Sequence, residues 1–355
     1  MTIPPSPAAR TTSDPRIRHW QKGQPRQNFG DYLSELLAIR MLRYPKVEAD
    51  VYHFIGSVID DSFISGGLRR ATGAVTGSIA FWGCGVRSER GPSEALRSNA
   101  LFFGVRGPIS RDILGLPQDT VLGDPGLLIP LVHSPNADVD TAGKTICIPH
   151  VFDERGDEEL LALSGTNMVV RPVVDNDLGA LSLLLDRIIA ADFVLTASLH
   201  GAIIAFAFDR PFALWHNGHL DVPLKWRDFA MSVGFLPNFV PDLRSGAAAY
   251  EGLLPQLVKR SLAPMLEICP FSVRPAMLLR AAVADGLIGA EEAKHAIALL
   301  DMIDLTEDRA QDALLSRSID YRLGRDRMSA ALARLQRHVT DDGKRRIKRM
   351  LGRAG

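Results

Sequence analysis

The feature that most constrains the fold of this chain is a regular alternation of strand-like and helix-like segments between residues 144 and 233. Short apolar segments alternate with segments whose apolar residues recur at helical spacing. The predicted strands, each with the helix that follows it, are Lys144–Ile148 and Glu158–Leu163, Met168–Val174 and Leu178–Ala190, Phe193–Thr196 and Leu199–Phe208, and Phe212–Trp215 and Lys225–Val233. Strands that alternate with helices across short polar joints predict βαβ units and a parallel sheet.

The first part of the chain repeats this pattern less regularly. A helix capped by Asn28 or Asp31 is predicted to run to Tyr44, and a second helix covers Ile109–Leu114. The other segments predicted there are the strands Val51–Ile59, Ile79–Trp82 and Leu101–Val105 and a flexible turn at Ser65–Gly67. Leu131–Gly143 is rich in Pro, Asp, Asn and Ser and is the predicted linker. We therefore predict two Rossmann-like, doubly wound α/β domains with parallel sheets that face each other across a cleft.

The domain boundaries follow from shifts in composition. Residues 1–27 are rich in proline and basic residues and nearly lack aliphatic ones, so we predict a mobile arm there. The first Rossmann-like domain is expected over residues 28–135 and the second over residues 144–265. Residues 270–355 are rich in Ala, Leu, Arg and Glu, which predicts a helical C-terminal extension that ends in a basic tail over residues 341–355.

The overall composition and charge exclude several classes of protein. Apolar residues make up 46% and charged residues 23%, the balance of a soluble globular protein. Lys+Arg and Asp+Glu both number 41, so we expect no nucleic-acid partner, and an anionic ligand must be held by local basic groups. The three cysteines show neither a disulfide framework nor zinc spacing. The longest apolar run, Gly201–Phe208, is too short to span a bilayer, and we expect a cytoplasmic protein.

The sharpest candidate for a site begins where the strand Phe193–Thr196 ends. Ser198 is placed to cap the next helix, and Leu199, His200 and Gly201 form its first turn. The N–H groups of a first turn have no partner within the helix, and the helix dipole favours an anion there. The segment therefore predicts a phosphate or carboxylate site, with His200 as hydrogen-bond donor or general acid. The alternative is that Ser198 only caps the helix and His200 only packs at the domain joint.

Arg106 is the second candidate. It follows an apolar strand and precedes Gly107 and Pro108 at the start of a helix. In open parallel sheets ligands gather at the carboxyl ends of strands, and a guanidinium there can form two parallel hydrogen bonds to a carboxylate or phosphate. The alternative is a surface arginine paired with Asp112 or Glu94.

Four other positions have simpler explanations available. Asp124 lies in a Gly-Asp-Pro-Gly turn, and its expected role is structural. His150 follows a strand and could face the cleft, although a lone histidine is more often structural. The Asp175–Asp177 segment resembles a metal-binding DxD pair, but helix capping explains it equally well. Lys225 begins a predicted helix and is a candidate for contact with a sugar or phosphate, with a solvated helix face as the alternative.

Several enzyme signatures are absent from the sequence. It contains no GxxxxGK[ST] loop, no HExxH, no GxSxG elbow and no well-formed GxGxxG after a first strand. Kinases, P-loop NTPases, zinc proteases and α/β-hydrolases are therefore not expected.

Six short motifs, in this order and spacing, connect the chain to a known family. They are Asn28-Phe29-Gly30-Asp31, Gly104-Val105-Arg106-Gly107-Pro108-Ile109-Ser110, Gly123-Asp124-Pro125, Ser198-Leu199-His200-Gly201-Ala202, Arg210-Pro211 and Lys225-Trp226-Arg227-Asp228-Phe229. Through them the sequence resembles the polysaccharide pyruvyl transferases, and among these the exopolysaccharide ketal-pyruvate transferases. The resemblance covers roughly residues 27–240.

The resemblance implies a GT-B-like fold and a specific reaction. Such enzymes move pyruvate from phosphoenolpyruvate onto a sugar as a cyclic ketal, commonly across O4 and O6. By position, Arg106 and His200 correspond to the residues that hold the donor, together with the helix start at Ser198, Leu199 and Gly201. The scheme calls for no metal and no cofactor besides the co-substrate phosphoenolpyruvate.

The remaining roles are assigned from the chemistry of that reaction. His200 is expected to be the acid for the methylene carbon or to protonate the departing phosphate, and Asp31 is expected to activate the sugar hydroxyl. Asn28, Lys225 and His150 are expected contacts to the acceptor or donor.

The resemblance also implies partners and leaves two rivals. The acceptor of such enzymes is often a lipid-linked oligosaccharide, so the basic tail is a candidate for peripheral contact with the inner face of the cytoplasmic membrane. A solvated helix end is the alternative for the tail. The rival functions are a GT-B glycosyltransferase that uses a nucleotide sugar and a non-catalytic subunit of exopolysaccharide assembly.

Overall fold

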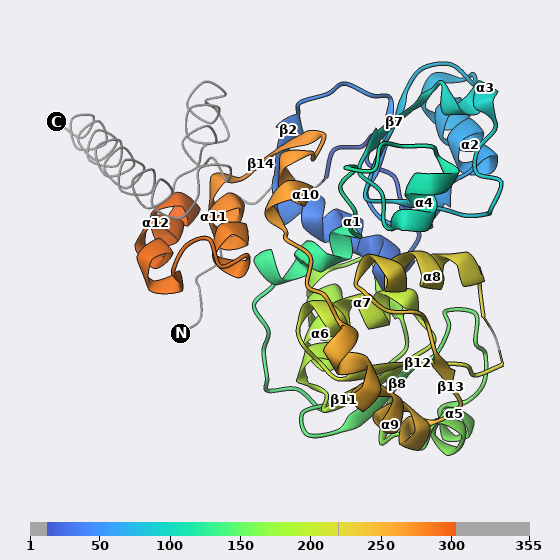
Figure 1. Cartoon of the computed structure of the whole chain (residues 1–355), viewed down its shortest axis with the longest axis vertical. Coiled ribbons are helices and arrows are strands. Elements are labelled where there is room, and N and C mark those ends of the chain that lie inside the picture. The colour runs from blue at the N-terminus through green and yellow to red at the C-terminus, as the bar shows by residue number, and fades with distance from the viewer. Residues whose placement is uncertain (1–12, 219, 303–355) are drawn as a thin grey trace. The chain divides into compact units, whose positions relative to one another are not determined.

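The structure, a computed structural model of the 355-residue chain, describes residues 13–218 and 220–302 (Figure 1). Contacts divide the described residues into two compact units. The core unit comprises residues 13–38 and 47–260, and the C-terminal unit comprises residues 39–46 and 261–302. The parallel sheets and helices of the core unit confirm a Rossmann-like α/β fold.

A three-stranded parallel sheet forms the first half of the core unit. Its strand order is β3-β5-β7, with β3 at Val51–His53, β5 at Ile79–Trp82 and β7 at Ala100–Phe103. A short parallel pair, β4 (Ser57–Ile59) and β6 (Gly85–Val86), extends beyond it. The strand predicted over residues 51–59 is therefore two strands, interrupted over residues 54–56, where Gly56 has φ +113°. A left-handed or similarly positive φ suits glycine because it lacks a Cβ.

The flexible turn predicted at residues 65–67 is wrong, because these residues lie inside helix α2 (Asp61–Thr72). The Asp60 carboxylate caps this helix by accepting from the N–H of Phe63. Gly67 faces the sheet, and a Cβ there would come within 3.3 Å of the Ile79 side chain. The glycine thus lets the helix lie close to the strand instead of marking a turn. The other helices of this half are α3 (Glu94–Arg97) and α4 (Pro108–Ile113).

A five-stranded, fully parallel sheet forms the second half of the core unit and confirms the predicted βαβ alternation. Its order is β13-β12-β11-β8-β9, with β8 at Thr145–Ile148, β9 at Met168–Val169, β11 at Phe193–Thr196, β12 at Phe212–Trp215 and β13 at Phe239–Val240. The helices are α5 (Asp157–Ser164), α6 (Leu178–Ala190), α7 (Leu199–Ala207), α8 (Pro223–Ser232) and α9 (Leu243–Leu253). Helices α6 and α7 cover one face of the sheet, and α5 and α9 lie on the other (Figure 1).

The mobile arm predicted for residues 1–27 is wrong for residues 13–27, which are folded; residues 1–12 lie outside the described residues. Ile17 is buried and forms a β-bridge with Tyr52. Strand β1 (Arg26–Asn28) pairs antiparallel with β10 (Val173–Asp175), the second part of the strand predicted at 168–174. Backbone pairing and buried polar groups hold this segment in place. Neither can be predicted from the periodicity of hydrophobic residues.

Direct contacts join the two halves of the core unit. The 3-10 helix η1 (Pro125–Leu131) packs on α7. In a second junction, Ser110 at the start of α4 donates its N–H and its hydroxyl to the buried Asp228 of α8, at 2.9 Å and 2.5 Å. Both halves therefore belong to one compact unit, and a boundary between residues 135 and 144 stays a prediction.

The C-terminal unit is mostly helical and contains one small sheet. Strand β2 (Leu42–Pro45) pairs antiparallel with β14 (Phe271–Val273), so the helix predicted to reach Tyr44 ends earlier, where α1 (Phe29–Arg40) stops. Its helices are α10 (Ala263–Glu267), α11 (Pro275–Ala284) and α12 (Ala290–Met302). The predicted basic tail lies outside the described residues.

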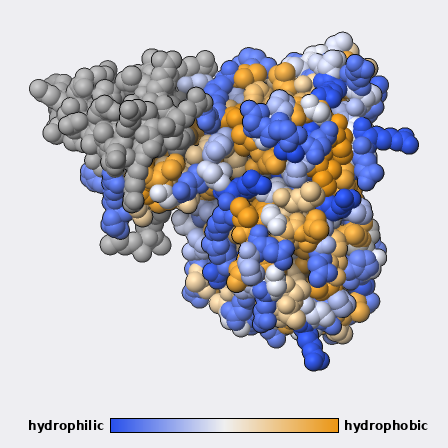
Figure 2. All heavy atoms as spheres, in the orientation of Figure 1, coloured by the Kyte–Doolittle hydropathy of each residue, from blue (hydrophilic) through white to orange (hydrophobic). Residues whose placement is uncertain are grey.

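The surface of the described residues is mixed in polarity. Figure 2 shows apolar residues interspersed with hydrophilic ones over the face in view. Within residues 13–218 and 220–302, no helix combines the length and the apolar character that crossing a bilayer requires.

Candidate active site

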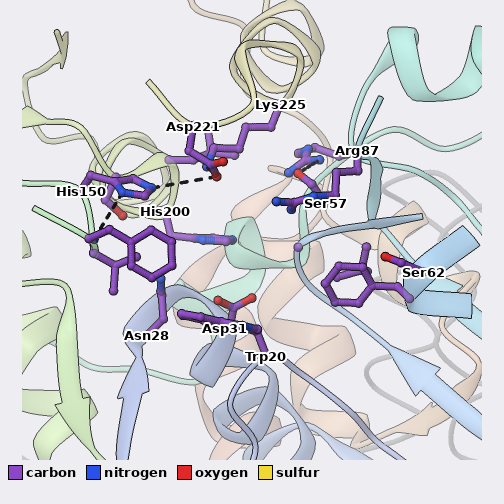
Figure 3. Close-up of a pocket in the computed structure, with 18 residues that line it drawn as sticks. Trp20, Asn28, Asp31, Ser57, Ser62, Arg87, His150, His200, Asp221 and Lys225 are labelled. Carbon is purple, nitrogen blue, oxygen red and sulfur yellow. Dashed lines mark hydrogen bonds and ion pairs between the residues drawn. The ribbon is translucent and has the colours of Figure 1, made fainter. Parts of the chain in front are cut away.

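A cavity of about 410 Å³ in the core unit gathers the residues that follow four strands (Figure 3). Arg87 follows β6, Arg106 lies three residues after β7, His150 follows β8 and Ser198 follows β11. Eight of the nine predicted site residues line this cavity: Asn28, Asp31, Arg106, His150, Ser198, Leu199, His200 and Lys225. The parallel topology therefore brings residues that are far apart in sequence to one place.

Gly201 is the predicted site residue that does not line the cavity. It packs against β11, where a Cβ would overlap the hydroxyl of Thr196. That hydroxyl accepts from the N–H of Ser198 at 3.0 Å and donates to the Ser198 carbonyl at 2.8 Å. Gly201 thus lets the first turn of α7 lie close to the strand end, which is a packing role.

The start of α7 is left open toward the cavity. Ser198 occupies the N-cap position as predicted, but its hydroxyl makes no capping hydrogen bond to the helix, all of whose residues the structure describes. The side chain of Ser198 lines the cavity instead, next to Leu199 and His200. First-turn N–H groups and the positive end of the helix dipole then face any anion that enters.

The imidazole of His200 is held between the two halves of the core unit. A Cβ on Gly30 would overlap this ring, and the ring of Phe29 meets it edge-on at 6.5 Å between centroids. Its Nε2 lies 3.9 Å from the Oδ2 of Asp124, and neither atom has a hydrogen-bond partner among the described residues. The glycine of the Asn-Phe-Gly-Asp motif is therefore what makes room for the histidine.

His200 is neutral at physiological pH. Burial, together with the weaker effect of the positive charges of Arg106 and Lys225, lowers its pKa to about 3. A neutral imidazole donates an N–H hydrogen bond or accepts a proton, but it has no second proton to give. The predicted acid role thus requires a bound anion that raises the pKa of His200.

Arg106 is completely buried and incompletely paired. One guanidinium nitrogen, Nη2, donates to the Ser57 hydroxyl at 2.8 Å, and Nε lies 3.6 Å from the Oδ2 of Asp228. The nitrogens Nε and Nη1 have no hydrogen-bond partner in the described part of the chain. The alternative partners considered for it are not used, since Asp112 pairs with Arg111 instead. A buried N–H without a partner is costly, so a guanidinium that lines a cavity in this state is suited to an anionic ligand.

Asp31 is one of two carboxylates, with Asp221, that line the cavity in the described part of the chain. Asn28 caps α1 by accepting from the N–H of Gly30 at 2.9 Å, which leaves the Asp31 side chain available to the cavity. Burial raises the pKa of Asp31 to about 6, against the weaker effects of His19, Lys225 and Arg87. A carboxyl group with this pKa exchanges its proton near neutral pH, as an acid–base catalyst must.

Asp124 is a buried residue beside His200. Its Oδ1 accepts from the N–H of Gly126 at 2.9 Å and caps η1, which agrees with its predicted structural role. Burial raises its pKa to about 6, although the nearby Arg106 lowers it. Asp124 also faces His200, a position that the turn motif did not reveal.

A linked group of charges closes the opposite side of the cavity. Lys225 donates to Asp221 at 2.7 Å, and the Nε2 of His150 lies 4.0 Å from the same carboxylate (Figure 3). Burial lowers the pKa of Lys225, whereas its ion pair with Asp221 raises it. Lys225 therefore adds positive charge to the cavity, and Asp221 fixes its position.

Two kinds of residue were missed by the sequence analysis. Arg87 is exposed, lines the cavity and directly follows Val86, which ends the two-residue strand β6 that the sequence analysis did not predict. Trp20 and Phe152 also line the cavity, and no sequence signal identifies them. We call Arg106, His200 and the start of α7 the buried wall, and Arg87, Trp20 and Phe152 the rim.

The described residues show no obvious place for a metal ion. No group of three or more His, Cys, Asp or Glu side chains among them is arranged to hold one. In the DxD-like segment, the Asp177 carboxylate caps α6 by accepting from the N–H of Ala180 at 2.8 Å. The capping explanation of this segment is confirmed.

The fold and the cavity define an α/β protein with a cavity lined by basic side chains at the carboxyl ends of parallel strands. Residues 3–214 match the family model for polysaccharide pyruvyl transferases, which is more than half of the chain. The chain belongs to this family, which identifies it as an enzyme of pyruvate transfer in polysaccharide synthesis. The resemblance to this family is confirmed, and the match covers five of the six motifs, since Lys225-Trp226-Arg227-Asp228-Phe229 lies beyond residue 214. No match was found among curated proteins or among solved structures.

Proposed function

We propose that this enzyme transfers the pyruvate of phosphoenolpyruvate to a sugar of a polysaccharide repeat unit as a cyclic ketal across O4 and O6. The observation that carries the proposal is the buried wall, where the unpaired Nη1 of Arg106 and the open start of α7 serve one cavity with His200. The two Rossmann-like halves would then act like the two domains of a GT-B enzyme.

Phosphoenolpyruvate fits the charge of this cavity. It carries a carboxylate and a phosphate on a three-carbon frame, and a chain of zero formal charge can bind it only through local cations. The buried wall supplies a guanidinium and helix N–H groups, and Lys225 and Arg87 add two further positive charges. Binding of the anion would also raise the pKa of His200, since it offsets the positive charges that now depress it.

Asp31 is suited to both proton transfers of the first step. In its protonated form it gives a proton to the methylene carbon of phosphoenolpyruvate, so C2 becomes electrophilic. A sugar hydroxyl then attacks C2 and returns its proton to the Asp31 carboxylate. A pKa of about 6 keeps both forms accessible near neutral pH.

The second step releases phosphate. The C2–phosphate bond breaks, and the second sugar hydroxyl closes the ketal ring while its proton leaves with the phosphate. A hydrogen bond from His200 and the charge of Arg106 would stabilise the departing phosphate. One phosphoenolpyruvate and one sugar diol thus yield one ketal and one inorganic phosphate, without a redox change.

The proposal is tested by incubating the protein with phosphoenolpyruvate and a panel of oligosaccharides. We expect a pyruvyl adduct by mass spectrometry and one phosphate released per adduct. Phosphoenolpyruvate should also raise the melting temperature. Stabilisation by nucleotide sugars alone, without an adduct, would contradict the proposal and favour a glycosyltransferase.

We also propose that the acceptor is carried on a lipid at the cytoplasmic face of the membrane, with the basic tail on anionic headgroups. Removal of residues 341–355 should then reduce binding to vesicles that contain phosphatidylglycerol, while activity on a soluble acceptor persists. Unchanged vesicle binding would contradict this role of the tail.

A further inference from the structure

Two aromatic side chains at the rim have no role in binding a small anion. The rings of Trp20 and Phe152 meet edge-on, with 5.6 Å between centroids and an interplanar angle of 88°. Both line the cavity, and Phe152 is 62% exposed. An exposed phenyl ring at the mouth of a charged cavity leaves apolar area in water, which burial by a ligand would remove.

The loop that carries Trp20 is anchored on both sides of this residue. The buried Glu35 of α1 pairs with the Nε2 of His19 at 3.2 Å and with Lys22 at 2.7 Å. Burial raises the pKa of Glu35, but these hydrogen bonds outweigh it and lower the pKa to about 2, so the anchor is charged at any working pH. Trp20 lies between the two anchored residues and is thereby presented to the cavity.

A second anchor fixes the end of the same loop. The buried side chain of Gln27 donates to the carbonyls of Gln21 and Gln24, at 2.9 Å and 2.6 Å. Two buried polar side chains therefore hold a short segment that presents the partly exposed Trp20. Ordering a loop costs conformational entropy on folding. A side chain in a loop that is already ordered does not incur this cost again when it binds a ligand.

The loop that carries Phe152 is held in a similar way. The carboxylate of Asp153 accepts from Arg155 at 2.6 Å and from the amide of Asn217 at 2.5 Å. The N–H of Phe152 lies 3.3 Å from the Nδ1 of His150, and the two rings are 5.4 Å apart. Both aromatic residues are thus preorganised before any ligand arrives.

We propose that Trp20 and Phe152 form a stacking platform for the acceptor pyranose ring, an inference that depends on the proposed function for its place in the reaction. One face of a pyranose presents C–H groups, which pack on the negative face of an aromatic ring, while its hydroxyls remain available at the edge. Trp20 and Asp31 enter the cavity from the same side, opposite Lys225 and Asp221 (Figure 3). A sugar on the platform would place its hydroxyls beside Asp31, with the donor anion on the buried wall.

The platform can be observed without turnover, because Trp20 is a selective fluorescent reporter. The chain has four tryptophans, all among the described residues, and Trp82, Trp215 and Trp226 are each 1% exposed. Iodide should therefore quench Trp20 alone. We expect the methyl β-glycosides of glucose, galactose and mannose to include at least one that protects Trp20 from iodide, and Phe152→Ala to abolish that protection. No protection by any of them, or protection unchanged by Phe152→Ala, would overturn the platform.

Kinetics with the acceptor found by mass spectrometry separate this inference from the proposed function. Phe152→Ala and Trp20→Ala should each raise the KM for the acceptor about tenfold, the size of an aromatic contact of roughly 1.4 kcal/mol, and leave stabilisation by phosphoenolpyruvate unchanged. Phe152→Tyr should restore the acceptor KM. The matched control is Leu236→Ala, which alters a residue that is 73% exposed and does not line the cavity.

Two results would distinguish the failures. An unchanged acceptor KM in Phe152→Ala, with normal transfer from phosphoenolpyruvate, would overturn the platform and leave the proposed function standing. Protection of Trp20 by a glycoside in a protein that does not use phosphoenolpyruvate would support the platform and reject the proposed function.

Discussion

The buried wall and the rim of the cavity differ in how the chain holds them. Arg106 and the start of α7 follow strands of the two parallel sheets, and glycines beside Arg106 and His200 leave room for both side chains. Trp20 and Phe152 belong to loops whose positions depend on long-range polar anchors such as Glu35 and Asp153.

This difference suggests that the two regions bind different substrates. The wall is buried and carries the positive charge of Arg106, so electrostatic interactions there are strong. Its side chains cannot be replaced without disturbing their surroundings. The rim is aromatic and exposed to solvent, so its contacts are weaker. Its side chains can be replaced without disturbing the sheets. Donor recognition would then be fixed by the fold, and acceptor recognition would be set by loops.

The largest effect is expected where the two regions meet, at Asp31. Asp31→Asn keeps the size of the side chain but removes proton transfer, so turnover should fall about a thousandfold. Phosphate release under saturating phosphoenolpyruvate is the measurement. Turnover within tenfold of the wild type would show that another group moves the proton.

The same variant should be more stable than the wild type at neutral pH. The pKa of Asp31 is raised from 3.8 to about 6, so the folded protein holds a proton that the unfolded chain releases. Stability from this group is therefore fully present below about pH 4, is lost as the pH rises to about 6, and stays lost above it. Asp31→Asn should gain about 3 kcal/mol at pH 7.5 and much less at pH 4, as measured by denaturant unfolding. Equal gains at both pH values would reject the raised pKa.

Arg106 is the second test, and it probes the wall itself. Arg106→Ala should lower kcat/KM about a hundredfold and abolish stabilisation by phosphoenolpyruvate, because a buried charge that faces the donor is lost. The matched control is Arg111→Ala, since this arginine pairs with Asp112 and does not line the cavity. Equal, small effects in both variants would remove Arg106 from the site.

Most of the second sheet could be predicted from the sequence, because its strands are short and buried and its helices show clear apolar spacing. The predictions were wrong where tertiary packing and hydrogen bonds, not local sequence preference, determine the conformation. Helix α2 contains Gly66 and Gly67, which favour a turn locally, yet packing against the sheet keeps them helical. The segment 13–27 is held by strand pairing with β10, which is distant in the chain, and by hydrogen bonds from Gln27 to nearby backbone carbonyls.

The wall was predictable for the same reason that the second sheet was. A basic residue or a helix start at the end of a strand is a local pattern, and parallel topology brings such patterns together. Lys225 was found through its motif, whereas its partner Asp221 was not. Trp20 was assigned to a mobile arm, because a single aromatic residue among prolines carries no periodic signal.

His200 is the third test, and it asks which chemistry the wall performs. His200→Ala should reduce turnover about a hundredfold, but His200→Gln should retain about a tenth of the wild-type rate, because a glutamine amide still donates a hydrogen bond. The pKa of His200 is about 3 in the free protein and should rise when the anion binds, so binding of phosphoenolpyruvate should take up protons as the pH falls, and His200→Gln should remove this uptake. If His200→Gln were as impaired as His200→Ala, proton transfer by the imidazole would be the better explanation.

The smallest effect is expected at the rim cation, Arg87. This guanidinium is exposed, so its attraction to the donor is weakened by solvent and by salt. Arg87→Ala should raise the KM for phosphoenolpyruvate about threefold at low ionic strength and leave kcat unchanged. At about 0.5 M salt the difference from the wild type should vanish, whereas the defect of Arg106→Ala should persist, since salt does not screen a buried charge. If salt removed the kinetic defects of both variants equally, Arg106 would be as exposed to solvent as Arg87, and the distinction between wall and rim would be wrong.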